Sequence, residues 1–262
     1  MKNKNIKMIW IIIIAAVSFY SLACILVYFF QTRLLFFPRQ NSPIYENKKI
    51  SIKNGDITLK AFLLNKGRDK LLIYFGGNAE DISDNIPDFN TFDDHTILLP
   101  NYRGYGGSDG KPGEKEILDD ALFIYDWIML NNDKYTNIIV MGRSLGSGVA
   151  SYLASKRYVD KLILVTPYDS IENVAKEMYP YLPVFLILKH KFNSKEFIKA
   201  YQNDVLVLLA EHDRVVSYYR SEKLMEYINR GKLKKVTIKG TSHNNINSCQ
   251  DYWREILSFI HQ

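Results

Sequence analysis

The chain has 262 residues, 47% of them apolar, which is enough for one sizeable domain with a large core. The first 40 residues hold five basic and no acidic residues, and the rest holds 29 basic and 28 acidic ones, so the net charge of +6 belongs mostly to the N-terminus. The remainder is nearly neutral and has no basic run or nucleic-acid fingerprint, so we expect no nucleic-acid partner.

The N-terminal segment predicts a membrane anchor, with the bilayer as a partner. After a basic tail at residues 1–7, residues 8–30 carry no charge, and a helix of this length spans about 34 Å, slightly more than a bilayer core. A cleaved signal peptide is the competing interpretation. The apolar run of this chain is longer than that of a signal peptide, however, and the chain shows no small-x-small cleavage site. We expect an uncleaved single-pass anchor, with the following domain extracytoplasmic because the short N-terminus is basic.

The rest of the chain changes from alternating to continuous apolar strands. A juxtamembrane linker is expected at residues 31–48, followed by a domain at residues 49–262 that begins with a β-hairpin turning at Asn54-Gly55. Continuous apolar runs then predict six buried strands, which makes a mainly parallel eight-stranded sheet with helices on both faces. These runs are 71–75, 96–99, 138–141, 162–165, 205–210 and 236–238.

Helical segments separate these runs. They are expected at 80–92, 114–130, 145–157, 218–229 and 246–261. Residues 168–203, here called the excursion, are too long for a simple crossover and contain the apolar stretch Met178 to Leu188. This stretch is interpreted either as a short helical lid or acyl channel at the membrane, or as an ordinary buried helix.

The sequence Gly142-Arg143-Ser144-Leu145-Gly146 lies between a predicted strand and a predicted helix. This is the G-x-S-x-G pattern of a nucleophile elbow, in which a strained turn presents the serine. The glycines at 142 and 146 are expected because the strand and helix pass so close that a Cβ would collide. Ser144 is therefore the candidate nucleophile, the alternative being a purely structural turn.

A serine hydroxyl needs a base to take its proton and a carboxylate to orient that base. Asp213 follows the strand at 205–210 and His243 follows the strand at 236–238, which gives the chain order Ser, Asp, His. The competing acid is Asp169, which follows the strand at 162–165. His212 adjoins Asp213 but precedes the usual position of the base.

A serine nucleophile also requires N–H donors for the oxyanion of the tetrahedral intermediate. The backbone N–H of Leu145 is one candidate, and the N–H of Asn78, in the loop Gly76-Gly77-Asn78, is the other. The glycines at 76 and 77 let this loop approach the substrate. No complete phosphate-binding glycine motif and no Cys/His metal spacing is present, so neither a nucleotide, a metal nor another cofactor is expected.

Together these residues resemble the α/β-hydrolase superfamily, and in particular its membrane-anchored bud-emergence-type branch, related to protein depalmitoylases and lysophospholipid hydrolases. The resemblance rests on the stretches 73–79, 101–110 and 142–146, the Asp213 loop and His243. The family pattern has His-Gly-Asn where this chain has Gly76-Gly77-Asn78, which removes a histidine that helps to hold the loop. It also often has Asp where Asn101 stands.

The leading hypothesis is a membrane-anchored serine hydrolase that cleaves a carboxylic ester or thioester of an acylated lipid or protein through an acyl-enzyme on Ser144. The anchor and the apolar excursion favour an acyl substrate. A serine amidase or peptidase of the same fold is the enzymatic alternative. A membrane-tethered binding domain without catalysis is the other alternative, which the altered position Gly76 favours and the complete Ser, Asp and His set disfavours.

Overall fold

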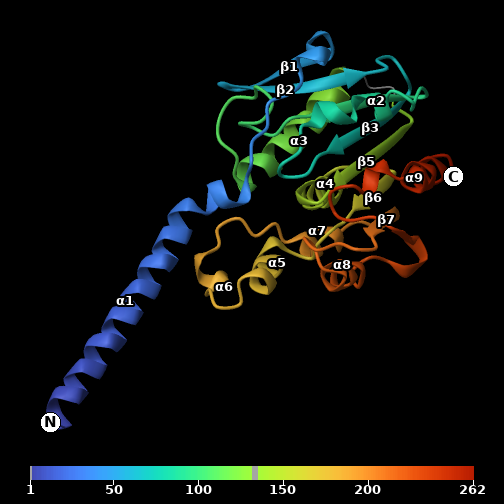
Figure 1. Ribbon diagram of the computed structural model, residues 1–262. Helices are drawn as coiled ribbons and strands as arrows, with labels where there is room; N and C mark the ends of the chain where they lie inside the picture. Colours follow the sequence, from blue (N-terminus) through green and yellow to red (C-terminus); the bar gives the residue numbers. More distant parts are fainter. Residues whose placement is uncertain (1, 132–134) are drawn as a thin grey trace.

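The computed structural model describes residues 2–131 and 135–262, and shows a three-layered domain from which one long helix projects (Figure 1). Residue 1 of the expected basic tail lies outside the described residues. The sheet has eight strands in the order β1-β2-β4-β3-β5-β6-β7-β8. The strands are β1 Lys49–Asn54, β2 Ile57–Leu64, β3 Lys70–Phe75, β4 His95–Pro100, β5 Asn137–Arg143, β6 Lys161–Val165, β7 Asp204–Ala210 and β8 Leu233–Ile238.

Strand direction follows the apolar pattern. β1 and β2 form the expected antiparallel hairpin, and β2 also pairs antiparallel with β4. From β4 to β8 all neighbours are parallel, as the doubly buried runs predict. The chain leaves β3 to form β4 on one side and then returns to form β5 on the other. The carboxyl ends of β3 and β5 therefore flank a crevice of the kind where open α/β sheets bind ligands.

Alternate side chains of the strands fill the two faces of the sheet. On one face, Leu71, Ile73 and Phe75 of β3 pack in the cluster that contains buried residues of α3 Glu114–Asn131, α4 Leu145–Lys156 and α8 Tyr218–Met225. On the other face, Leu72 and Tyr74 pack in the cluster containing buried residues of α2 Ile86–Phe89 and α9 Gln250–Ile260. Both faces of the sheet are thus covered by helices.

The helix expected at 80–92 is much shorter in the structure. It consists of the 3-10 helix η2 Ile82–Asn85 and the single turn α2. Pro87 has no N–H with which to continue an α-helical ladder, and Asp81 accepts from Ser83 N–H instead. Similarly, the last expected helix begins as η4 Ile246–Ser248 before α9, and the helix expected at 218–229 ends at Met225. A further short turn, η3 Arg230–Lys232, precedes β8.

The N-terminal helix α1 Lys2–Leu35 is longer than the apolar run and is followed by the 3-10 helix η1 Pro43–Lys48. Among the described residues it is the one helix long and apolar enough to cross a membrane. Its last turn enters the domain, because Gln31 and Phe36 are only 4% and 2% exposed. The helix therefore fits a single-pass membrane protein whose anchor is packed directly onto the domain.

The excursion at 168–203 contains three short helices, α5 Ile171–Met178, α6 Val184–Ile187 and α7 Ser194–Ile198. α6 lies beside the C-terminal half of α1, α5 contacts α6, and α7 packs on α4 (Figure 1). The excursion is thus placed between the anchor and the carboxyl edge of the sheet.

Candidate active site

Ser144 stands between β5 and α4 in a left-handed backbone conformation, with φ 50° and ψ −117°. Such a conformation is strained for a residue with a side chain. The turn is held by Ser144 N–H, which donates to Val165 O at 2.9 Å. A Cβ at Gly142 would lie 2.1 Å from Gly146 O, and one at Gly146 would lie 2.0 Å from Phe75 O. Only glycine fits at these two positions without moving backbone.

His243 lies between Ser144 and Asp213 in a hydrogen-bonded chain. Its Nε2 is 2.9 Å from Ser144 Oγ, and its Nδ1 is 2.7 Å from Asp213 Oδ2. An ionised carboxylate only accepts, so Nδ1 carries the proton and Nε2 is free to accept from the serine hydroxyl. The side chains of His243 and Asp213 are each 8% exposed. The geometry is that of a nucleophile, a base and an orienting acid.

The carboxylate of Asp213 is fixed by its own loop. Its Oδ1 accepts hydrogen bonds from Val215 N–H at 2.9 Å and Val216 N–H at 2.8 Å, which leaves Oδ2 for His243. His212, the neighbouring histidine, points away into solvent beside Glu211 and is 68% exposed. The structure therefore brings together Asp213 and His243 and not His212.

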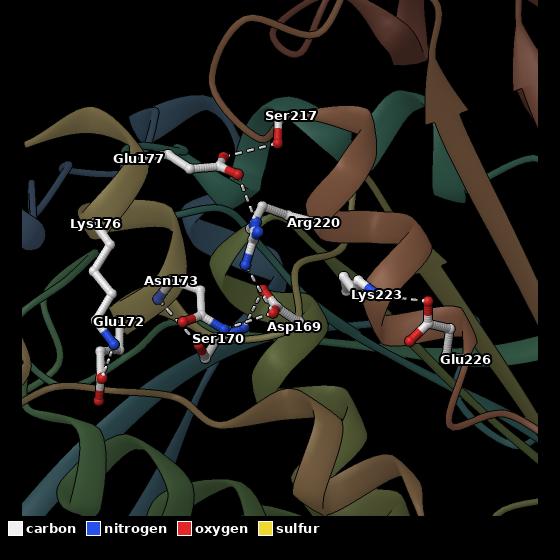
Figure 2. Close-up of polar contacts among 10 residues, drawn as sticks. All are labelled: Asp169, Ser170, Glu172, Asn173, Lys176, Glu177, Ser217, Arg220, Lys223 and Glu226. Carbon is white, nitrogen blue, oxygen red and sulfur yellow. Dashed lines mark hydrogen bonds and ion pairs between the residues drawn. The ribbon is translucent and has the colours of Figure 1, made fainter. Parts of the chain in front are cut away.

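Asp169, the competing acid, takes part in a different network (Figure 2). Its carboxylate accepts from Ser170 N–H, from Asn173 Nδ2 at 2.6 Å and from Arg220 at 3.1 Å. Arg220 also pairs with Glu177 at 2.8 Å, so this one residue of α8 is tied both to α5 and to the segment just before it. Asp169 is thus a buried anchor of the excursion rather than a partner of the histidine.

The loop after β3 lies opposite Ser144, and sequence reasoning missed what holds it. Glu80 Oε2 accepts from Gly77 N–H at 2.7 Å, while Glu80 Oε1 accepts from Tyr74 Oη at 2.8 Å and from Asn85 Nδ2 at 2.6 Å. A Cβ at Gly76 would lie 3.3 Å from the carboxyl carbon of Glu80. The Glu80 carboxylate therefore lies against the backbone of this loop, which lacks the histidine of the family pattern.

Two tyrosines of the glycine-rich stretch at 101–110 also hold this loop. Tyr102 Oη donates to Gly76 O and Tyr105 Oη donates to Asn78 O, both at 2.7 Å. Burial raises the pKa of both phenols above the ordinary value, so both remain protonated donors. The sequence offered a signal for these two tyrosines, because the stretch 101–110 is part of the family resemblance and no other role was assigned to it.

Arg143, the variable residue before the nucleophile, connects the two sides of the site. Its guanidinium lies 3.6 Å from Glu80 Oε2, and its Nη2 donates to His243 O at 3.0 Å and to Asn244 O at 3.1 Å. Burial disfavours its charge, but the Tyr74 phenol and the Glu80 carboxylate beside it raise its pKa above the ordinary value. One cation thus ties the histidine loop to the loop after β3.

The C-terminal end of the anchor is part of the same site. Asn78 Nδ2 donates to Leu35 O at 2.7 Å, and Phe37 N–H donates to Asn78 O at 3.3 Å. Asn78 and Leu145, the two candidate oxyanion donors, line a cavity of about 850 Å³ together with Ser144 and His243. Its apolar walls come from α1 and its extension (Leu34, Leu35, Phe37), from α5 (Ile171, Val174, Ala175, Met178, Tyr179) and from Val215 and Val216.

Within residues 2–131 and 135–262, no group of three or more His, Cys, Asp or Glu side chains is placed to hold a metal ion. The cavity thus places the Ser144 hydroxyl, hydrogen-bonded to His243, beside the two candidate donor residues.

Comparison with known proteins agrees with this architecture. A family model described as alpha/beta hydrolase fold matches residues 70–186. The chain is 34% identical over 149 residues to the lysophosphatidylserine lipase ABHD12 of Danio rerio, covering 50% of this chain and 38% of that one. It is 30% identical over 173 residues to an uncharacterized membrane protein of Saccharomyces cerevisiae, covering 63% and 60%. It spans about half the length of the curated relatives it matches.

Among solved structures, an esterase of Pyrococcus furiosus superposes with a TM-score of 0.70 at 17% sequence identity, covering 86% of this chain and 98% of the esterase. At that identity the likeness concerns the fold. The resemblance to α/β-hydrolases expected from the sequence is confirmed. By its sheet order, its family-model match and its structural likeness, the chain has the α/β-hydrolase fold.

Proposed function

We propose that the protein is a membrane-anchored serine hydrolase that cleaves a carboxylic ester or thioester of an acylated substrate. The observation that carries the proposal is the hydrogen-bonded chain from Ser144 Oγ through His243 to Asp213 at the floor of an apolar cavity. A lysophosphatidylserine lipase and a membrane protein among the relatives support a lipid at a membrane as the substrate. A fatty acyl chain fits a cavity walled by the anchor and by α5.

In the acylation step, Ser144 Oγ attacks the carbonyl carbon while its proton passes to His243 Nε2. The N–H groups of Leu145 and Asn78 face the oxyanion that forms, each worth roughly 3 to 4 kcal/mol of transition-state stabilisation. The tetrahedral intermediate expels the alkoxide or thiolate, which takes the proton from His243. In deacylation, His243 removes a proton from water, the hydroxide attacks the acyl carbon, and Ser144 is regenerated as the free acid leaves.

Labelling of membranes with a fluorophosphonate probe tests the nucleophile. Wild-type protein should react and Ser144→Ala should not, although Ser144→Ala keeps the same thermal unfolding midpoint. We expect His243→Gln and Asp213→Asn to label far more slowly. Absence of labelling in folded wild-type protein would favour a tethered binding domain.

The proposed extracytoplasmic position of the domain is tested with a membrane-impermeant probe added outside intact cells. Such a probe reaches Ser144 only if the domain lies outside.

Substrate class is tested by comparing nitrophenyl esters of increasing acyl length, the matching thioesters and aminoacyl nitroanilides. Because much of the cavity lining is apolar, kcat/KM should rise with acyl length among the esters. Each methylene that becomes buried is worth about 0.8 kcal/mol, or roughly fourfold in kcat/KM. Faster turnover of the nitroanilides than of every ester would support the amidase alternative instead.

A further inference from the structure

Residues 178–188 form an apolar tip of the excursion, here called the 178–188 tip. No charged residue occurs between Glu177 and Lys189. Five large apolar or aromatic side chains of the tip are more than half exposed, namely Met178, Tyr179, Tyr181, Phe185 and Leu186. Scattered apolar side chains on a surface are normal, whereas a contiguous exposed set marks an interaction surface.

The tip runs alongside the anchor helix (Figure 1). Tyr20 Oη of α1 donates to Tyr181 O at 2.7 Å, and Gln31 Nε2 donates to Ile187 O at 2.9 Å. Gln31 Oε1 in turn accepts from Lys189 N–H at 2.6 Å. Tyr20 and Gln31 are eleven residues apart on the helix, so the tip follows α1 over about 16 Å.

This contact fixes the depth of the tip once α1 spans a bilayer. About 20 residues of helix cross the hydrocarbon core, and the charge-free run lies between Lys7 and Arg33. Whichever 20 residues of that run cross the core, Tyr20 is among them. Tyr20 is also never one of the last five crossing residues at the domain end. Tyr181 is hydrogen-bonded to Tyr20, so it lies inside the bilayer and not in the water outside it.

The backbone of the tip suits an apolar medium, in which an unpaired N–H is costly. Pro180 and Pro183 carry no N–H. The N–H groups of residues 179, 182, 184 and 186–189 donate to acceptors within the tip, α5 or Gln31, and among the described residues only those of Tyr181 and Phe185 in this stretch lack a protein acceptor. At the domain end, Lys189 Nζ lies 3.9 Å from the ring centroid of Tyr28, a basic and aromatic pair of the kind found at a membrane interface.

The tip also continues into the cavity of the candidate site. Met178 and Tyr179 belong both to the exposed tip and to the cavity wall that contains Ser144, and Leu34 and Leu35 of α1 form the facing wall. We infer that the 178–188 tip inserts into the bilayer beside α1, and that the space between the two is where the acyl chain of a membrane lipid enters the cavity laterally. The entry route rests on the proposed function, whereas the insertion does not.

Insertion is tested with the full-length protein in phosphatidylcholine vesicles. A Cys24→Ser, Cys249→Ser background accepts a single cysteine, either Leu186→Cys in the tip or Leu130→Cys on α3, and each is labelled with the fluorophore NBD. Both parent side chains are strongly exposed, at 70% and 88%, so the labels differ in place and not in burial. Lipids with a doxyl quencher in the acyl chain should quench the label at 186 at least threefold more than the label at 130.

Equal quenching at the two positions would overturn the insertion. The measurement is repeated in Ser144→Ala, so it is independent of whether the protein is a hydrolase. The entry route is tested with Leu186→Glu, which should lower kcat/KM at least tenfold for nitrophenyl palmitate dissolved in the vesicles and leave nitrophenyl acetate in water unchanged. An equal loss on both esters, or no loss on palmitate, would overturn the lateral route.

Discussion

The carboxylate of Glu80 accepts a hydrogen bond from the N–H of Gly77 at 2.7 Å, directly beside Asn78, whose N–H is the proposed oxyanion donor. A loop with two consecutive glycines has high conformational freedom. Because Glu80 is itself held by Tyr74, Asn85 and Arg143, it restricts that freedom before substrate binds. Pre-organised donors of this kind cost no reorganisation during the reaction.

Replacing Glu80 by Gln should therefore reduce kcat on a water-soluble ester by about 10- to 100-fold with little change in KM, since small misplacements of reacting groups cost that much. An amide presents a donor where the carboxylate accepts from Gly77 or from Tyr74 and Asn85, and it leaves Arg143 without a counterion. Asp84→Asn, which neutralises another carboxylate of the cavity wall, is the control and should retain wild-type kcat. A rise in KM alone would argue against positioning.

Arg143→Lys should lower kcat about tenfold, equivalent to about 1.4 kcal/mol in the barrier. The planar guanidinium reaches Glu80 on one side and two carbonyls of the histidine loop on the other, and a single ammonium does not bridge both. The fluorophosphonate labelling rate should fall in parallel, because His243 is less well oriented. Unchanged labelling with lowered stability would indicate a purely structural role.

Gly146→Ala should prevent folding, with a destabilisation above about 5 kcal/mol, because the added Cβ would lie 2.0 Å from Phe75 O in the middle of the fold. Gly231→Ala is the matched control, since the nearest atom to its Cβ would be 3.6 Å away. Circular dichroism and soluble yield distinguish the two variants. A folded Gly146→Ala protein would mean that strand β3 and helix α4 have room to separate.

Arg220→Ala should destabilise the protein by about 3 kcal/mol, because it leaves the buried carboxylate of Asp169 without its cation. Adding Asp169→Asn should restore part of that loss, since a neutral amide carries no unpaired charge. The thermal midpoints of the single and double variants measure the effect. If the double variant were less stable than Arg220→Ala, the charge of Asp169 would not be the cause.

His190 should make stability sensitive to pH. Its Nε2 lies 2.9 Å from Thr32 Oγ1 of α1, its Nδ1 accepts from Glu114 N–H, and burial lowers the pKa of the imidazole. In the unfolded chain the His190 imidazole takes up a proton near pH 6.5, whereas in the folded chain it does so only at lower pH. The free energy of unfolding that His190 contributes is therefore fully present above about pH 6.5 and is lost as the pH falls below it. Glu114 contributes in the opposite direction. Burial raises the pKa of its carboxyl, so the folded chain binds this proton more readily than the unfolded chain and gains stability as the pH falls.

The unfolding midpoint should thus drop between pH 7.5 and 5.5 in the wild type, and drop less in His190→Gln. His95 is also buried with a lowered pKa and contributes in the same direction, so some pH dependence should persist in the variant. An identical pH dependence in both proteins would exclude His190 as a contributor.

The sequence predicted the strands well because buried strands read as continuous apolar runs, and each of the six such runs lies within a strand of the sheet. The positions of Ser144, Asp213 and His243 were accessible because each follows such a run at the same edge of the sheet. The helix expected at 80–92 is wrong because Pro87 has no N–H for an α-helical ladder and the carboxylate of Asp81 caps a 3-10 turn.

The contacts that hold the site were not accessible from the sequence. Glu80 looked like the first residue of a helix, and its partners Tyr74 and Arg143 lie at the ends of two different strands. Tyr20 appeared to be a minor polar member of an apolar helix and Gln31 the first residue of a linker, yet both bond to residues more than 150 positions away. Such pairings depend on how β3, β5 and α1 are placed in space, which no local pattern encodes.

The packing of the last turn of α1 into the domain has a consequence for shedding from the membrane. Leu34, Leu35 and Phe37 form one wall of the cavity, and the carbonyl of Leu35 holds Asn78. Proteolysis in the segment at 38–42 would leave that wall behind with the anchor and release a domain with an open cavity and a loosened loop. Cleavage would therefore act as an off switch of the proposed hydrolase, so that an intact site exists only while the helix α1 is still joined to the domain.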